Sequence, residues 1–64
     1  MNFYIYVNTN HAGRFLAATV NERRAITAVV IGLKETYKPQ GFVGCDVFED
    51  SYVTGKPPIH SFKF

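Results

Sequence analysis

Residues 3–7 read FYIYV, a stretch in which Phe3, Ile5 and Val7 alternate with two tyrosines. Because successive side chains of a strand point to opposite faces of a sheet, these three residues share one face and the tyrosines share the other. The wealth of aromatic and β-branched residues also favours a strand, which we predict over residues 2–8. One face must belong to the core, so the question is what covers the other.

A second strand follows a short polar stretch. Residues 9–13 read TNHAG and end in glycine, which is typical of a hairpin loop. We predict the second strand over residues 14–19 or 14–20. Alternation divides it into two sets that are both largely apolar: Leu16, Ala18 and Val20 on one face, and Phe15, Ala17 and Thr19 on the other. Composition therefore leaves its core face open.

The clearest element is an amphipathic helix. Its apolar residues recur at the three- and four-residue intervals of one helix face: Ile26, Val29, Val30, Leu33 and Tyr37. Thr19 and Glu22 have the spacing of a capping box at its start. Asn21 as N-cap, with Glu22 in the first turn, is an equally good start.

The sequence also indicates where this helix ends and which residues lie on its outer face. Pro39 disfavours helical geometry at Lys38, so the helix is predicted to end there, and Gly41 completes the turn. Ile31 interrupts the polar face, either as a flank of the core stripe or as an exposed apolar contact. The residues that lack bulk are expected to lie close against the sheet: Ala25, Ala28 and Gly32.

A third strand is predicted over residues 42–49. Val43, Cys45 and Val47 form its expected core face, because Asp46 alternates with them and an unpaired buried charge is costly. The opposite face would carry the remaining alternate residues: Phe42, Gly44, Asp46 and Phe48.

The C-terminal residues predict shorter elements. A turn over residues 49–51 leads into a short strand over residues 52–54. Residues 55–58 contain two prolines, which cannot donate to a ladder, and are expected to form an extended loop. Residues 59–64 would then be a final edge strand with its larger side chains on one side: His60, Phe62 and Phe64.

This element order predicts an α+β fold, namely a small antiparallel sheet of three to five strands, β-β-α-β-(β)-(β), with one helix packed on one face. Residues 1–64 are expected to form a single domain. Since one helix covers one face, the other is expected to carry an aromatic patch: Tyr4, Tyr6, Phe15, Phe42 and Phe48. Phe62 and Phe64 would either join this patch or fold back over it.

The expected patch has three interpretations. The chain or a second copy covers it, as in a homodimer; a larger protein docks on it; or single-stranded nucleic acid stacks on it. Protein docking is the preferred function because Tyr, Phe and Arg are enriched at interface cores and hot spots. In the nucleic-acid alternative Arg14, Lys56 and Lys63 would contact phosphates, but Asp46 would repel them and the net charge is only +2.

A second candidate docking surface is the helix face around Arg23, Arg24, Thr27 and Ile31. Either surface would act sterically, by occupying a site on a larger protein or complex. No motif identifies a family. Small regulators encoded by phages and other mobile elements are often of this size and class, so an accessory or inhibitor role is the working hypothesis.

The sequence predicts no catalytic residue, metal site or cofactor. A zinc site usually needs four ligands at recognisable spacings, whereas Cys45, His11 and His60 lie far apart. Cys45 alternates with two valines, a position in which a free thiol behaves as a small hydrophobe. The glycines are scattered singly, which excludes a phosphate-binding glycine-rich loop.

Localisation is inferred from missing signals. The N-terminus has neither a basic run nor a long apolar run. The longest apolar run, residues 28–33, is far shorter than the about 20 residues of a membrane span. A single cysteine suits a reducing compartment. We therefore expect a cytoplasmic protein with no membrane partner.

Overall fold

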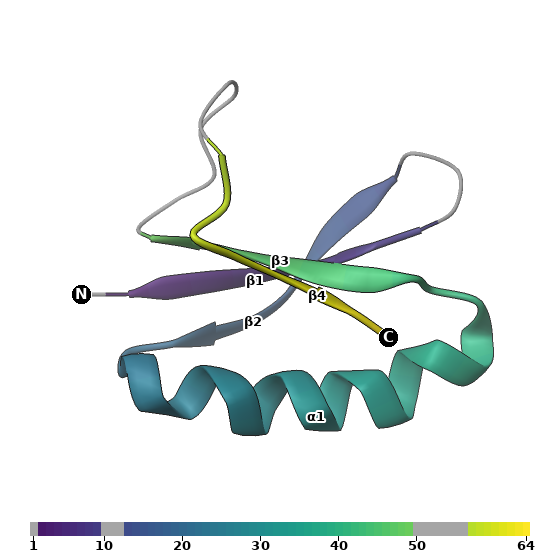
Figure 1. Ribbon diagram of the computed structural model, residues 1–64, viewed down its shortest axis with the longest axis horizontal. Coiled ribbons are helices and arrows are strands. Elements are labelled where there is room, and N and C mark those ends of the chain that lie inside the picture. Colours follow the sequence, from purple (N-terminus) through teal and green to yellow (C-terminus); the bar gives the residue numbers. More distant parts are fainter. Residues whose placement is uncertain (1, 10–12, 50–56) are drawn as a thin grey trace.

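The computed structural model describes residues 2–9, 13–49 and 57–64. Four antiparallel strands form one open sheet in the order β2-β1-β3-β4, and one helix accompanies them (Figure 1). The elements in chain order are β1 (Phe3–Asn8), β2 (Arg14–Val20), a 3-10 turn η1 (Arg23–Ala25), α1 (Ile26–Tyr37), a second 3-10 turn η2 (Lys38–Gln40), β3 (Gly44–Glu49) and β4 (His60–Lys63). The predicted α+β class is therefore confirmed.

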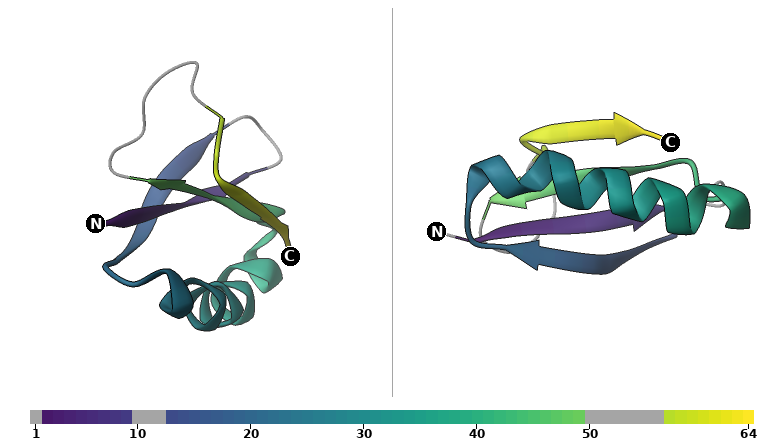
Figure 2. Two further views of the ribbon diagram at one scale, coloured as in Figure 1. Left: turned by 60° about the vertical axis from the view of Figure 1, so that its left-hand side comes forward. Right: turned by 90° about the horizontal axis from the view of Figure 1, so that it is seen from below.

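The sheet and the helix form two layers. α1 runs along one face of the sheet, and β2 and β4 form its two margins (Figure 2). β1 and β2 form a hairpin, after which α1 carries the chain back to the other side of β1, where β3 pairs. β1 and β3 thus occupy the centre of the sheet.

The core lies between the central strands and α1. It is built from alternate residues of β1 and β3 and from two residues of the helix: Phe3, Ile5, Val7, Cys45, Val47, Ile26 and Val30. The remaining apolar stripe of α1, Val29, Leu33 and Tyr37, packs against this cluster while staying half-buried. The alternation in FYIYV and the helical spacing from Ile26 to Tyr37 are both confirmed.

A β-bulge in β2 determines which of its residues face the core, a question that composition left open. Ile5 lies opposite Ala18 and Tyr6 lies opposite Leu16, so Ala17 is an extra residue without a partner of its own. Because directly opposed residues share a face, the bulge reverses the alternation. Leu16 therefore lies on the tyrosine side of the sheet, whereas Ala18 lies on the core side.

The helix begins later than the sequence suggested. Thr19 belongs to β2, and Glu22 precedes η1 in extended geometry without a side-chain cap. Both proposed starts, the capping box and the Asn21 cap, are therefore wrong. The Glu22 carboxylate instead accepts a hydrogen bond from Arg24 Nε at 2.7 Å. A cap is dispensable here because packing of the apolar stripe on the sheet stabilises the helix.

The helix ends one residue before the predicted Lys38. Lys38 itself keeps helical geometry, with φ of -57° and ψ of -44°, so the expected effect of Pro39 on that residue is wrong. The outer face of the helix also differs from the prediction. α1 stops at Tyr37, and the chain passes through η2 to Gly41, whose φ of 93° is left-handed. Ala28 and Gly32 are exposed, so the expectation that they lie against the sheet is wrong; Ala25 is half-buried. Their positions fall outside the stripe that the larger core residues occupy.

The C-terminal half differs in two details. β3 starts at Gly44, and Val43 is exposed rather than part of the core. β4 pairs with β3, with Phe62 opposite Cys45, so Phe62 lies on the core side and does not fold over the tyrosine side. Phe64 also packs against the core. The strand predicted over residues 52–54 and the turn before it lie largely outside the described residues.

Candidate binding surfaces

The sheet face turned away from α1 carries a small amphipathic surface. Tyr4 lies between Thr19 of β2 and Phe48 of β3, and Tyr6 lies between Leu16 and Asp46. We call the surface formed by Tyr4, Tyr6, Leu16 and Thr19 the tyrosine face. Both tyrosines are half-buried, whereas Leu16 is 47% exposed. Leu16 is thus the apolar side chain that this surface offers most openly.

Phe48 lies on the predicted side of the sheet but is not part of the exposed surface. Its side chain is only 3% exposed. The ring meets Tyr6 edge-on at a centroid distance of 5.6 Å, and the Arg14 guanidinium lies 5.7 Å from its centroid. Phe48 is therefore a packing residue, and the expectation that it presents an aromatic contact is wrong.

Phe15 and Phe42 were expected on the same face and lie on the other. Both meet Tyr37 of α1, at ring-centroid distances of 5.5 and 5.4 Å, and their own rings are 5.6 Å apart. Phe15 is on the helix side because the bulge at Ala17 shifts the register. Phe42 precedes β3, where strand alternation does not apply. The aromatic patch is consequently smaller than predicted.

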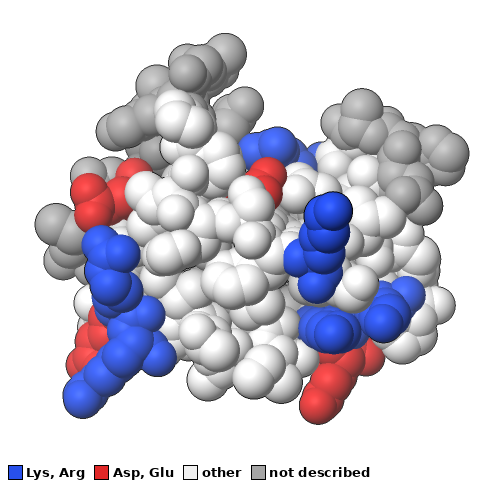
Figure 3. All heavy atoms as spheres, viewed as in Figure 1, with Lys and Arg blue, Asp and Glu red and all other residues white. Residues whose placement is uncertain are grey.

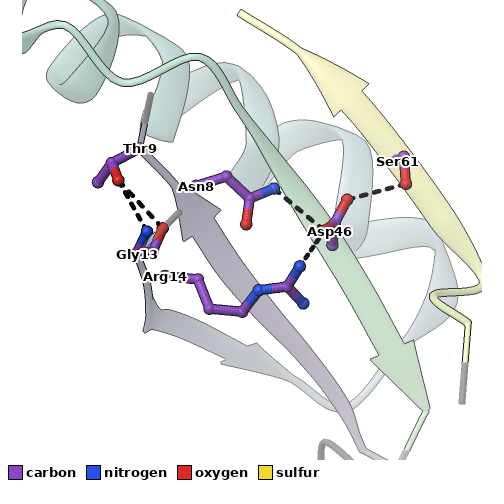
Figure 4. A network of polar contacts seen from close by, with 6 residues as sticks. All are labelled: Asn8, Thr9, Gly13, Arg14, Asp46 and Ser61. Carbon is purple, nitrogen blue, oxygen red and sulfur yellow. Dashed lines mark hydrogen bonds and ion pairs between the residues drawn. The ribbon is translucent and has the colours of Figure 1, made fainter. Parts of the chain in front are cut away.

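A polar network centred on Asp46 crosses the sheet beside the tyrosine face (Figure 4). The Asp46 carboxylate accepts hydrogen bonds from Asn8 Nδ2 at 3.0 Å and Ser61 Oγ at 2.8 Å. It also forms an ion pair with Arg14 Nη2 at 3.2 Å. These groups come from β1, β4 and β2, so one carboxylate on β3 links all four strands.

The network changes the roles expected for Asp46 and Arg14. Asp46 is 14% exposed at its side chain and lies next to a guanidinium, so the negative charge that was expected to repel phosphates is paired. Arg14 was a candidate phosphate contact and is engaged by this carboxylate instead. Asn8 and Ser61 were not singled out, although their pairing positions, opposite Gly44 and Asp46, follow once the register is known.

The outer face of the helical segment carries the second set of predicted partner-binding residues. Arg23 lies 5.3 Å from the Phe3 ring centroid and 3.9 Å from a Glu49 carboxylate oxygen. Arg24 pairs with Glu22, and Thr27 is exposed. Ile31 is the most exposed large hydrophobic side chain among the described residues, at 55%. Arg24, Thr27 and Ile31 are thus exposed on the helical segment, whereas Arg23 reaches back to residues at the end of β1 and β3.

Cys45 is fully buried in the core. Burial, and secondarily the charge of Asp46, raises the pKa of its thiol from about 9 to about 11. The thiol is therefore protonated near neutral pH and lacks the thiolate that nucleophilic chemistry needs. His60 is exposed and lies against Phe62. Within the described ranges, no group of three or more acidic, His and Cys side chains could bind a metal ion. His11 and Lys56 lie outside these ranges.

The buried thiol predicts a loss of stability at high pH. A raised pKa means that the folded chain holds the thiol proton more tightly than the unfolded chain does. The associated stability is complete below about pH 9 and lost as the pH rises to about 11, a difference of about 2–3 kcal/mol. Urea unfolding at pH 8, 9, 10 and 11 measures it, with Cys45→Ala as the control for titrating tyrosines and lysines.

An alkylation experiment checks the same burial independently. Iodoacetamide at pH 8 is expected to leave Cys45 of the native protein unmodified and to modify it in urea. Rapid modification of the native protein, or identical pH profiles for the native sequence and Cys45→Ala, would contradict a buried, protonated thiol.

Comparisons of the chain with protein-family models, with curated proteins and with solved structures gave no match. Within the described part of the chain, no helix has the length and apolar character needed to cross a membrane. The function must therefore be argued from the two surfaces themselves.

Proposed function

We propose that this chain is a non-catalytic protein-binding domain that acts by covering a site on a larger protein. The observation that supports this most is the tyrosine face, where an exposed leucine lies beside two half-buried tyrosines on the sheet side opposite α1. Tyrosine suits such a place because its ring gains from burial while its hydroxyl still finds a polar partner. The protonated, buried Cys45 thiol agrees with a role that involves no thiol chemistry.

A protein partner is favoured over single-stranded nucleic acid by the charge beside this surface. Asp46 lies next to Tyr6, and the Arg14 guanidinium that would attract phosphate is paired with it. A bound phosphate would have to compete with a carboxylate for that guanidinium. The net charge of +2 also provides little general attraction for a polyanion.

The helix face around Arg23, Arg24, Thr27 and Ile31 is the second candidate for the same function. Ile31 is more exposed than Leu16, and its neighbours Ala28 and Gly32 are also exposed. The two arginines are, however, already paired with carboxylates. We therefore rank this face after the tyrosine face.

The setting of this function is part of the proposal. We infer a cytoplasmic accessory or inhibitor protein of the kind that phages and mobile elements encode, by analogy of size and class. A homodimer is the competing explanation, in which a second copy covers the tyrosine face. Light scattering coupled to size exclusion at moderate salt separates these cases, because a stable dimer would turn attention to the helix face.

Two matched substitutions distinguish the candidate faces. Leu16→Ser and Ile31→Ser each remove an exposed aliphatic side chain, but from opposite layers of the molecule. We expect Leu16→Ser to weaken partner binding about tenfold or more, because interface energy concentrates in few residues, and Ile31→Ser to leave it unchanged. Binding is measured by cross-linked capture from an extract of the source cells, with each partner identified by mass spectrometry.

The outcomes of this experiment separate the alternatives. Loss of the same partner with Ile31→Ser but not with Leu16→Ser would move the function to the helix face. Capture of single-stranded oligonucleotides, with an affinity that falls steeply as salt rises, would replace protein binding by nucleic-acid binding. Circular dichroism of both variants shows whether the fold is retained, which any interpretation requires.

A further inference from the structure

The margin of the sheet at β4 has an open hydrogen-bonding edge. β4 pairs with β3 on one side, and Phe64 N donates to Val43 O at 3.0 Å. Because antiparallel strands alternate inward and outward pairs, Phe62 also faces β3, whereas the backbone groups of Ser61 and Lys63 point outward. No described element lies beyond β4 (Figure 2). Such an edge is a template for an additional strand.

The surface beside this edge is apolar. Phe62 and Phe64 lie on the helix side of β4, and Val29 and Leu33 of α1 pack against the same core; all four remain partly exposed. Figure 3 views the molecule from the β4 side and shows a broad uncharged surface reaching from β4 down to α1. A strand added next to β4 would place every second side chain over this surface.

The charges around the edge are unbalanced. Every arginine of the chain is paired with a carboxylate. Lys34, Lys38 and Lys63, in contrast, have no ion-pair partner within the described residues. The helix dipole stabilises the positive charges of Lys34 and Lys38 near the C-terminal end of α1. It does not stabilise Lys63, which lies at the end of β4. Figure 3 shows basic side chains on the right of the uncharged surface, with an acidic side chain directly below them.

We propose that the β4 edge binds an extended acidic segment of another protein, which joins the sheet as a fifth strand. Its backbone would pair with the outward groups of Ser61 and Lys63, and its apolar side chains would contact Phe62 and Leu33 on the helix side. The carboxylates that alternate with them would approach Lys63, whose side chain lies on the opposite side of the sheet. Main-chain bonds supply affinity in this mode, and the side-chain contacts supply specificity.

The occupant and the edge are both selected by the structure. A second copy pairing through β4 would bring no carboxylate side chain to Lys63, because residues 57–64 contain neither aspartate nor glutamate. The opposite edge, β2, is interrupted by the bulge at Ala17, and bulges disfavour edge pairing. This proposal does not involve the residues of the tyrosine face, which belong to β1 and β2, although the Lys63 side chain lies on the same side of the sheet.

The test uses the whole chain and two synthetic octapeptides, one alternating valine with glutamate and one alternating valine with lysine. Amide hydrogen exchange is followed by NMR. We expect the glutamate peptide to slow exchange at the Ser61 and Lys63 amides by about tenfold or more, while Phe62, already bonded to β3, changes little. The lysine peptide should have no effect on exchange, and added salt should weaken the binding of the glutamate peptide.

A charge-matched pair of variants tests Lys63. The variant Lys63→Gln lowers the net charge by the same amount as Asn21→Glu, whose position is exposed and lies between β2 and η1. We expect the first to weaken peptide binding about tenfold and the second to leave it nearly unchanged.

Four results would overturn the proposal. The first is amide exchange at Ser61 and Lys63 that stays unchanged at high peptide concentration, and the second is equal binding of both peptides. The third is a dimer in solution whose fraction rises further with Lys63→Gln. The fourth is tighter binding of oligothymidylate than of the glutamate peptide. Because none of these measurements involves Leu16, such a failure is distinguishable from failure of the tyrosine face.

Discussion

Replacement of Phe48 by alanine is expected to lower the free energy of unfolding by about 3–5 kcal/mol. The ring is 3% exposed, meets Tyr6 edge-on and lies under the Arg14 guanidinium, so its removal leaves a cavity and removes one of the contacts of that guanidinium. A chain of 64 residues is expected to have a total stability of only about 3–10 kcal/mol. The Phe48→Ala protein should therefore unfold at a much lower urea concentration than the native sequence, as urea titration followed by circular dichroism will show.

Tyr4→Ala is the matched control for Phe48→Ala. Tyr4 lies directly opposite Phe48 on the same face but is half-buried, so the loss of its ring should be several times less costly and should leave the fold intact. Equal stability of Phe48→Ala and the native sequence would show that Phe48 is a surface residue. It would then return to the candidate partner-binding residues.

Gly44→Ala is expected to cost about 1–3 kcal/mol or more and to loosen β4 selectively. A Cβ at this buried position would run into the carbonyl oxygen of Phe62 and lie 3.3 Å from the Cα of Lys63. Both are backbone atoms, so relief requires β4 to move away from β3 as a whole. Native-state hydrogen exchange should show faster exchange at the Phe62 and Phe64 amides, while β1 keeps its protection.

Gly32→Ala is the control for Gly44→Ala because the same methyl group is added where nothing lies within 4 Å. Gly32 is inside α1 and exposed, so alanine should raise the stability by about 0.5–1 kcal/mol through helix propensity. If the two variants changed stability by the same amount, the close approach of β4 to Gly44 would be refuted. Because Gly44→Ala loosens β4, it should also weaken binding of the acidic peptide and leave Leu16-dependent binding unchanged.

Local rules were sufficient for the elements whose neighbours in sequence decide their conformation. The alternation in FYIYV assigns Ile5 to the core, and the apolar stripe from Ile26 to Tyr37 places α1 on the sheet. Proline and glycine near residue 40 mark the helix end. Each of these signals depends on a periodicity or a backbone restriction that is contained within a few residues, so the sequence by itself determined them.

The candidate sites depended on contacts between distant residues, and there the sequence was insufficient. One extra residue, Ala17, transfers Phe15 to the helix side, because a one-residue shift inverts every side chain beyond it. The partners of Asp46 come from three other strands and follow only from the register. Composition and periodicity determined the two layers, whereas strand order and register, which are set by pairing across the sheet, decided which side chains each surface presents.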